Sequence, residues 1–290
     1  MKSFAALLLF AFLLSYTAPC QNLEKVVFDT KDTTDGYYLA LRPRSNNIKG
    51  VLVLCTSFST PEWMLPETKL HNVAYANDLL TILVCLKQKL YADTPTVNRL
   101  NALLKHVTAT YAAGTSKFVL AGYDFAGNAV LRFAELTKEH PSQFALQPKA
   151  VFAIGSPVDL FGLWRWCERQ VKRKSRSAWD ANFILELMTK EHGTAPSQME
   201  QYRKPTPFYA AADTTGNAQF IEDIPVRLYY DVDPEWHLKE RQNSLYDTFL
   251  PDGTELINRL LLLGNRDAEL VMARQPGRNS RVYVPRTHFP

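Results

Sequence analysis

The sequence is poor in the residues that mark fibrous and disulfide-rich proteins. Its 290 residues include 12 glycines and 17 prolines without a triplet repeat, which excludes a collagen-like or low-complexity chain. Four cysteines are too few for a disulfide scaffold in a chain of this length. The formal net charge of +4 is mild and comes mostly from one local cluster, so we expect no nucleic-acid partner.

The remaining composition is that of a globular protein. Hydrophobic residues make up 46% of the chain and charged residues 21%, a balance that excludes disorder of the whole chain. The length suits one large domain or two modest ones.

The first twenty residues have the pattern of an export signal. A positively charged start precedes an apolar run over residues 4–14, and small residues precede Cys20. This run is shorter than the roughly 20 residues that a membrane-spanning helix needs. We expect residues 1–20 to be a signal peptide removed after Cys20, so that residues 21–290 form an exported domain, periplasmic or extracellular. The alternative is lipid attachment at Cys20, although the residues before it fit a lipid-attachment box poorly. No later segment reaches transmembrane length.

Three cysteines remain if Cys20 is lost, and an odd number cannot pair fully within one chain. They are Cys55, Cys85 and Cys167, of which the first two lie near the ends of predicted strands. One interpretation is that all three are small buried residues. The other is a single disulfide, which an oxidising compartment permits.

Apolar strands alternate with amphipathic helices along the chain. The predicted strands cover residues 25–30, 37–41, 51–55, 80–85, 117–121, 150–154, 225–230 and 269–272. The predicted helices cover residues 61–77, 96–112 and 126–140. This alternation predicts the α/β class, with a doubly wound, mostly parallel sheet of about eight strands covered on both faces. The first two strands form a hairpin around Asp35-Gly36 at an antiparallel edge.

The alternation stops between Asp159 and Asp223, where the chain is helical, aromatic and basic. We expect a helical lid insertion over about residues 160–223. Its basic residues are Arg165, Arg169, Lys172, Arg173, Lys174 and Arg176, interleaved with Trp164, Trp166 and Trp179. The cluster is either the solvated face of a lid helix or a lid that favours anionic or aromatic ligands.

The turn after the fifth predicted strand carries the main functional motif. Residues 117–135 read K-F-V-L-A-G-Y-D-F-A-G-N-A-V-L-R-F-A-E, an apolar strand followed at once by a helix. This resembles the nucleophile elbow of the α/β-hydrolase superfamily, and the element order is similar to exported dienelactone-hydrolase-like or esterase-like members over nearly the whole mature chain. Gly122 matches the first glycine, Asp124 takes the nucleophile position and Ala126 the second glycine position, with Gly127 next. The alternative is an ordinary strand–turn–helix in which Asp124 caps the helix.

An aspartate in this position changes the chemistry that the resemblance implies. Haloalkane dehalogenases and epoxide hydrolases of this superfamily use Asp here, followed by an aromatic residue, as in Asp124-Phe125. A carboxylate can displace a leaving group from saturated carbon without a base, but a histidine must then activate water to open the alkyl ester. No serine occupies the elbow, so an ordinary serine esterase is disfavoured.

The resemblance also assigns partners for Asp124, in the chain order nucleophile, acid, histidine. Asp233 matches the acid after the strand over residues 225–230, and Asp231 is the second choice. The alternative is that Asp233 caps a turn before Pro234. His288 follows the last strand and takes the histidine position, unless it is merely a tail residue.

The other histidines have the character of helix or surface residues and show no metal-ligand spacing; they are His71, His106, His140, His192 and His237. We therefore expect no metal and no cofactor.

Backbone N–H groups should form the oxyanion hole. The resemblance assigns them to Phe125, after the nucleophile, and to Ser57 or Phe58, after the third strand. Relatives carry glycine in the latter loop, but this sequence has none between Gly50 and Gly114.

Two functions follow from these features. One is a hydrolase that acts on a small organic substrate with Asp124, Asp233 and His288. The other is a catalytically inactive binding protein that keeps the fold. The second is favoured by four departures from the family: Asp124, Ala126, the glycine-free loop and the absence of a helix after His288.

Overall fold

The computed structural model describes residues 21–32, 34–45, 47–114 and 117–273. The proposed signal peptide, Cys20 and His288 lie outside the described residues. An eight-stranded sheet forms the centre, in the order β1-β2-β4-β3-β5-β6-β7-β8. Its strands are β1 (Leu23–Val27), β2 (Tyr37–Leu41), β3 (Gly50–Thr56), β4 (Leu79–Cys85), β5 (Phe118–Tyr123), β6 (Ala150–Ile154), β7 (Val226–Asp231) and β8 (Ala268–Ala273).

β2 runs antiparallel to both of its neighbours, β1 and β4, and the other strand pairs of the described residues are parallel. The predicted α/β class, strand number and antiparallel edge are therefore confirmed. β1 ends earlier than predicted, because Val27 is the last residue paired with β2. The turn that follows is closed by the N–H groups of Phe28 and Asp29, which donate to the Gly36 carbonyl at 2.9 and 3.0 Å.

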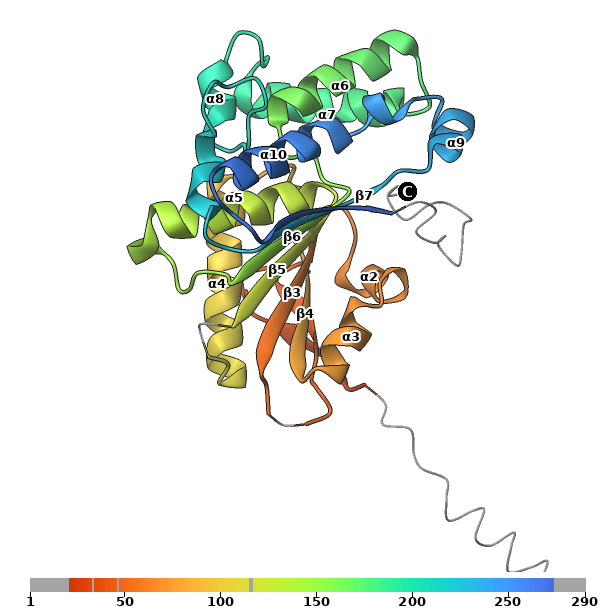
Figure 1. Ribbon diagram of the computed structural model, residues 1–290. Helices are drawn as coiled ribbons and strands as arrows, with labels where there is room; N and C mark the ends of the chain where they lie inside the picture. The colour runs from red at the N-terminus through yellow and green to blue at the C-terminus, as the bar shows by residue number, and fades with distance from the viewer. Residues whose placement is uncertain (1–20, 33, 46, 115–116, 274–290) are drawn as a thin grey trace, which may run out of the picture.

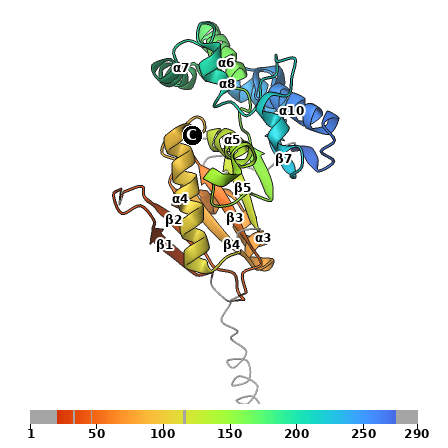
Figure 2. The same ribbon diagram turned by 90° about the vertical axis from the view of Figure 1, so that its left-hand side faces the viewer.

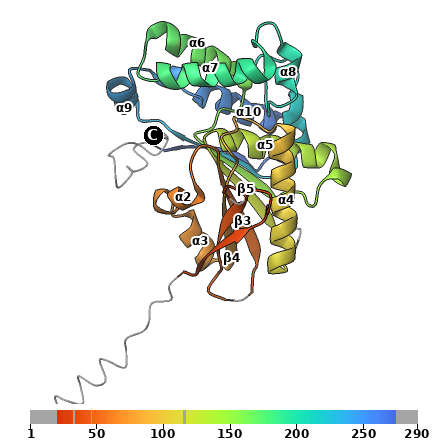
Figure 3. The same ribbon diagram turned by 180° about the vertical axis from the view of Figure 1, so that it is seen from behind.

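Helices cover both faces of the sheet, as the apolar strands require (Figure 1; Figure 3). On one face lie α4 (Thr94–Tyr111), α5 (Phe125–Glu139) and α10 (Leu250–Leu262), whose buried side chains join the largest core cluster. On the other face lie α2 (Pro61–Glu67) and α3 (Leu70–Ala76), which supply Met64 and Ala74 to a smaller cluster.

The prediction of one helix over residues 61–77 was wrong, because the chain breaks between α2 and α3. Thr68 adopts an extended conformation, with φ −134° and ψ 153°, directly after α2. Its hydroxyl oxygen accepts a hydrogen bond from the N–H of Leu70 at 3.1 Å. A side chain that bonds the neighbouring backbone in this way offers an alternative to the helical ladder, and here it separates the two helices.

Three helices between β6 and β7 lie beyond the carboxyl ends of the strands: α6 (Leu160–Arg173), α7 (Ala178–His192) and α8 (Met199–Arg203) (Figure 1; Figure 2). We call residues 160–203 the helical cover. Buried Asp159 ties the two ends of this region together, since its carboxylate accepts from the N–H groups of Phe161 at 2.8 Å and Ala210 at 3.0 Å.

Two arginines of the basic cluster, both on α6, form ion pairs with one buried carboxylate. Arg169 lies 3.1 Å from a carboxylate oxygen of buried Asp247, and Arg173 pairs with the second oxygen. The indole N–H of Trp166 donates to the Asp247 backbone carbonyl at 2.8 Å. These contacts fasten α6 to the loop before α10, so Arg169 and Arg173 have a structural role.

The three described cysteines are free thiols, with Cys55 and Cys167 buried and Cys85 partly buried. Their interpretation as unpaired buried residues agrees with this. Over the described residues, none of the helices combines the length and apolar character needed to cross a bilayer.

Candidate functional site

Asp124 lies at the turn between β5 and α5, at the carboxyl edge of the sheet, as the motif predicts. Its backbone has φ 51° and ψ −128°, a conformation that side-chain-bearing residues rarely adopt. Such strain costs about 1–3 kcal/mol and persists only where the surroundings enforce it. Here the Asp124 N–H donates to the Ile154 carbonyl at 2.9 Å, and the Asp124 carbonyl accepts from Gly127 at 3.0 Å.

Two glycines make the sharp turn sterically possible. A Cβ on Gly122 would lie 2.4 Å from backbone atoms of Ala126 and Gly127. A Cβ on Gly127 would lie 1.9 Å from Ser156 Oγ. The close contacts therefore fall on Gly122 and Gly127, and Ala126 fits because its side chain points into the core, where it is fully buried.

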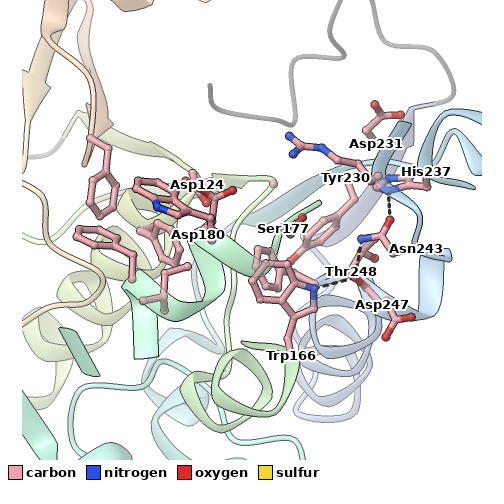
Figure 4. Close-up of a pocket in the computed structure, with 18 residues that line it drawn as sticks. Asp124, Trp166, Ser177, Asp180, Tyr230, Asp231, His237, Asn243, Asp247 and Thr248 are labelled. Carbon is pink, nitrogen blue, oxygen red and sulfur yellow. Dashed lines mark hydrogen bonds between the residues drawn. The ribbon is translucent and has the colours of Figure 1, made fainter. Parts of the chain in front are cut away.

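The carboxyl group of Asp124 faces a cavity of about 330 Å³ between the sheet edge and the helical cover. We call this the elbow cavity (Figure 4). Its acidic and basic lining residues are Asp124, Asp180, Asp231, Asp247, His237 and Arg241. Its aromatic walls include Phe58, Phe125, Trp166, Trp179, Phe183 and Phe249. Apolar walls with a few polar groups are typical of a site for a small organic molecule.

The surroundings of Asp124 favour its neutral form. Burial raises the pKa of this carboxyl from 3.8 to about 8, and the nearby charge of Asp180 acts in the same direction. The N–H of Phe125 opposes the shift, as a donor to the ionised form does. Apart from this contact, the Asp124 side chain makes no helix-capping hydrogen bond to α5, so helix capping does not account for this residue.

The two candidate acids, Asp231 at the end of β7 and Asp233 just after it, occupy different environments. Asp233 is buried, and its carboxylate accepts from the Trp236 N–H at 3.1 Å, which caps the short helix α9 (Pro234–Trp236). Asp231 lines the elbow cavity, and one of its carboxylate oxygens accepts from the Asp233 N–H at 3.1 Å. The structure thus places Asp231 in the lining of the cavity that Asp124 faces, whereas Asp233 caps α9.

His237 is a cavity residue that sequence reasoning placed among the helix or surface histidines. It is buried, with 3% of its surface exposed, and it lines the elbow cavity with Asp124 and Asp231. Its Nδ1 lies 3.3 Å from Asn243 Oδ1, an acceptor, so this contact favours the tautomer in which Nδ1 carries the proton. Burial lowers the pKa of His237, so the ring is mostly neutral at pH 7.

The loop after β3 stands beside the elbow, because Cys55 pairs with Gly122 across the parallel strands. Ser57 is buried, and its carbonyl accepts from the Gln88 N–H at 2.6 Å. The Phe58 ring lies edge-on to Phe125, with 5.6 Å between centroids. An aromatic ring from this loop therefore packs against Phe125, the residue that follows Asp124.

Within the described ranges, no group of three or more His, Cys, Asp and Glu side chains could hold a metal ion. One sequence signal could have found His237, since Asp124, Asp231 and His237 follow the chain order nucleophile, acid, histidine. It was missed because the resemblance directs attention to the segment after the last strand.

No family model and no curated protein sequence matches this chain. Solved structures do. Pyrococcus horikoshii acylaminoacyl peptidase superposes with a TM-score of 0.56 at 14% identity, over 94% of this chain and 40% of that one. A Pyrobaculum calidifontis esterase gives 0.51 at 14% identity, over 91% and 79%. An arylesterase gives 0.53 at 10% identity, over 94% and 87%. This chain thus spans about two fifths of the peptidase, and at these identities the likeness concerns the fold.

Proposed function

We propose that this chain, which has the α/β-hydrolase fold, is a hydrolase that uses Asp124 as its nucleophile on a small organic substrate. The supporting observation is the strained backbone of Asp124, held at the elbow with its carboxyl group facing an aromatic-walled cavity of about 330 Å³. An ordinary strand-to-helix turn has no need for this strain, whereas a nucleophile gains exposure and an adjacent backbone N–H from it.

The reaction would proceed in two steps. An ionised Oδ of Asp124 attacks a saturated carbon, and the carbon–leaving-group bond breaks as the alkyl–aspartyl ester forms. Water then gives a proton to a histidine and attacks Cγ of the ester to form a tetrahedral intermediate. Its collapse breaks the Cγ–O bond to the alkyl group, the histidine returns the proton to the departing oxygen, and the alcohol and the free carboxyl group of Asp124 result. The Phe125 N–H stands beside the carboxyl group and would stabilise the oxyanion that forms in the second step.

Isotope incorporation tests the nucleophile. With enzyme in excess over an aryl epoxide or alkyl halide in ¹⁸O-water, one turnover is expected to add about 2 Da to the peptide that contains Asp124. Mass spectrometry of the digested protein measures this, and Asp213→Asn, at an exposed loop position, is the control variant. Turnover that places ¹⁸O only in the alcohol would overturn the proposal.

The hydrolytic base can be identified by trapping the ester. His237 lines the cavity with Asp124, whereas sequence analysis predicts His288. We expect His237→Ala to accumulate an alkylated protein, visible by intact mass, because attack on the ester stalls without a base. His288→Ala is the matched variant, and accumulation of the ester in this variant alone would assign the base to His288. If neither variant accumulates the ester, the two-step mechanism is wrong.

A binding protein without turnover is the second candidate. The observation in its favour is the pKa of about 8 for Asp124, which leaves most of the carboxyl groups protonated and unreactive at pH 7. Activity at pH 9 and its absence at pH 6 would favour the hydrolase. Ligand affinity without turnover at either pH would favour the binding protein.

We also propose that the protein acts outside the cytoplasm, on the evidence of residues 1–20 alone. N-terminal sequencing of protein secreted by its own host tests this, with Gln21 as the expected first residue.

A further inference from the structure

One end of the elbow cavity combines a row of aromatic rings with two carboxyl groups, and we call it the aromatic end. Trp179 and Phe183, one turn apart on α7, are stacked at an interplanar angle of 5° with centroids 6.2 Å apart. Phe183 lies edge-on to Phe58 at 6.3 Å, and Phe58 in turn to Phe125 at 5.6 Å. The row therefore leads from the residue beside Asp124 to Trp179, which is 77% exposed at the cavity mouth.

Asp180 shares this end of the cavity with Asp124 (Figure 4). Among the described residues, neither carboxyl group has an ion-pair partner within 4.0 Å. The two groups also repel each other, since the charge of Asp180 disfavours ionisation of Asp124. A positively charged ligand would supply the missing ion-pair partner and would reduce the repulsion between the two carboxyl groups.

The other charged groups that face the cavity are largely occupied. Asp247 is paired with Arg169 and Arg173. Asp231 accepts from the Asp233 N–H and lies near His237.

Arg241 is the remaining cation of the cavity lining. Its positive charge acts to lower the pKa of Asp180. Its guanidinium, however, lies over the Trp236 ring, 5.4 Å from the centroid. Within the described residues, no cation therefore lies within ion-pair distance of the Asp180 carboxyl group at the aromatic end.

We propose that the aromatic end of the elbow cavity binds an organic cation, so that the substrate carries an ammonium group and Asp180 is its specificity-determining residue. An ammonium ion is attracted by the faces of aromatic rings within about 6 Å as well as by carboxylates. The stacked pair of Trp179 and Phe183 flanks Asp180 on the same helix, which supplies both kinds of contact at one place. The inference rests on the proposed function only in taking this cavity as the substrate site.

Binding of a cation would also prepare the nucleophile. Positive charge near Asp124 favours its ionised form, so ligand binding is expected to lower the pKa of Asp124 from about 8. At pH 7 the protein should release a proton as the cation binds. Calorimetry detects this release as a binding enthalpy that depends on the ionisation enthalpy of the buffer.

The test compares benzylammonium with benzyl alcohol, a neutral molecule of almost the same shape, by isothermal titration calorimetry at pH 7 and low salt. We expect the wild-type protein to bind the cation about tenfold more tightly. Asp180→Asn is expected to remove most of this preference while leaving the affinity for benzyl alcohol unchanged. Glu186→Gln, an exposed position on the same helix, is the matched control and should keep the preference.

Equal affinities for the two probes, binding of neither, or an unchanged preference in Asp180→Asn would overturn this inference. The experiment requires no turnover, so its failure is distinct from failure of the proposed function. Cation binding without turnover would remove the hydrolase and keep the cation site. Turnover of neutral substrates without a preference for cations would do the reverse.

Discussion

Replacing Asp124 by asparagine is expected to lower turnover by at least about a thousandfold, because an amide cannot displace a leaving group from carbon. The same change should stabilise the folded protein at neutral and alkaline pH. Asparagine has nearly the shape of aspartate, so the elbow and its contacts remain, and Asn tolerates positive φ better than most residues. Steady-state kinetics and urea unfolding of the same preparations measure the two effects.

The sign of the stability effect follows from the raised pKa of Asp124. Below pH 3.8 the carboxyl group is protonated in the folded and unfolded chains, and the two states bind equal numbers of protons. Between pH 3.8 and about 8 the folded protein holds a proton that the unfolded chain has lost, so the free energy of unfolding falls as pH rises. Above pH 8 the penalty is constant.

Asp124→Asn removes this penalty, and at pH 8 we expect a gain of at least about 2 kcal/mol over the wild type. This is less than the whole pKa shift implies, because the residue is only partly buried and solvent screening weakens the penalty. At pH 4 the two proteins should be nearly equal in stability. A variant that is less stable than the wild type at pH 8 would mean that contacts hold Asp124 in its ionised form, contrary to a carboxyl group kept neutral by burial. Asp213→Asn serves again as the exposed control.

Gly122→Ala is expected to destabilise the protein by about 3 kcal/mol or more. The added Cβ would lie 2.4 Å from the Ala126 carbonyl carbon and oxygen and from the Gly127 nitrogen. All three are backbone atoms at the start of α5, so no side-chain rotation relieves the overlap. The elbow would open or the helix would shift, and any activity would fall with it. Thermal and urea unfolding measure the loss.

Gly114→Ala is the matched control for this substitution, since nothing lies within 4 Å of the added Cβ. Its stability should change by less than about 1 kcal/mol, with a small gain from the stiffer unfolded chain. If Gly122→Ala behaves like Gly114→Ala, the elbow is looser than its contacts indicate, and the strain argument for Asp124 loses its basis.

The sequence by itself determined the sheet and the elbow, because both depend on local patterns. Apolar runs of five to seven residues, such as those of β3 and β4, mark strands buried on both faces whatever surrounds them. The small residues around Asp124 predict a sharp turn, since only Gly122 allows the start of α5 to approach β5 so closely. Helix continuity was less predictable, and the break at Thr68 depends on one side-chain hydrogen bond.

Only the tertiary structure decided which side chains share the elbow cavity. Asp180 reaches it because α7 packs across the carboxyl edge of the sheet, and no periodicity within α7 specifies that placement. Asp231 and Asp233 are only two residues apart in the chain, yet Asp231 lines the cavity and Asp233 caps α9. His237 directly follows α9 and lies near Asp231, whose charge acts on it. Such convergence depends on how separate elements pack, and a pattern along one segment carries no information about the neighbours it will meet.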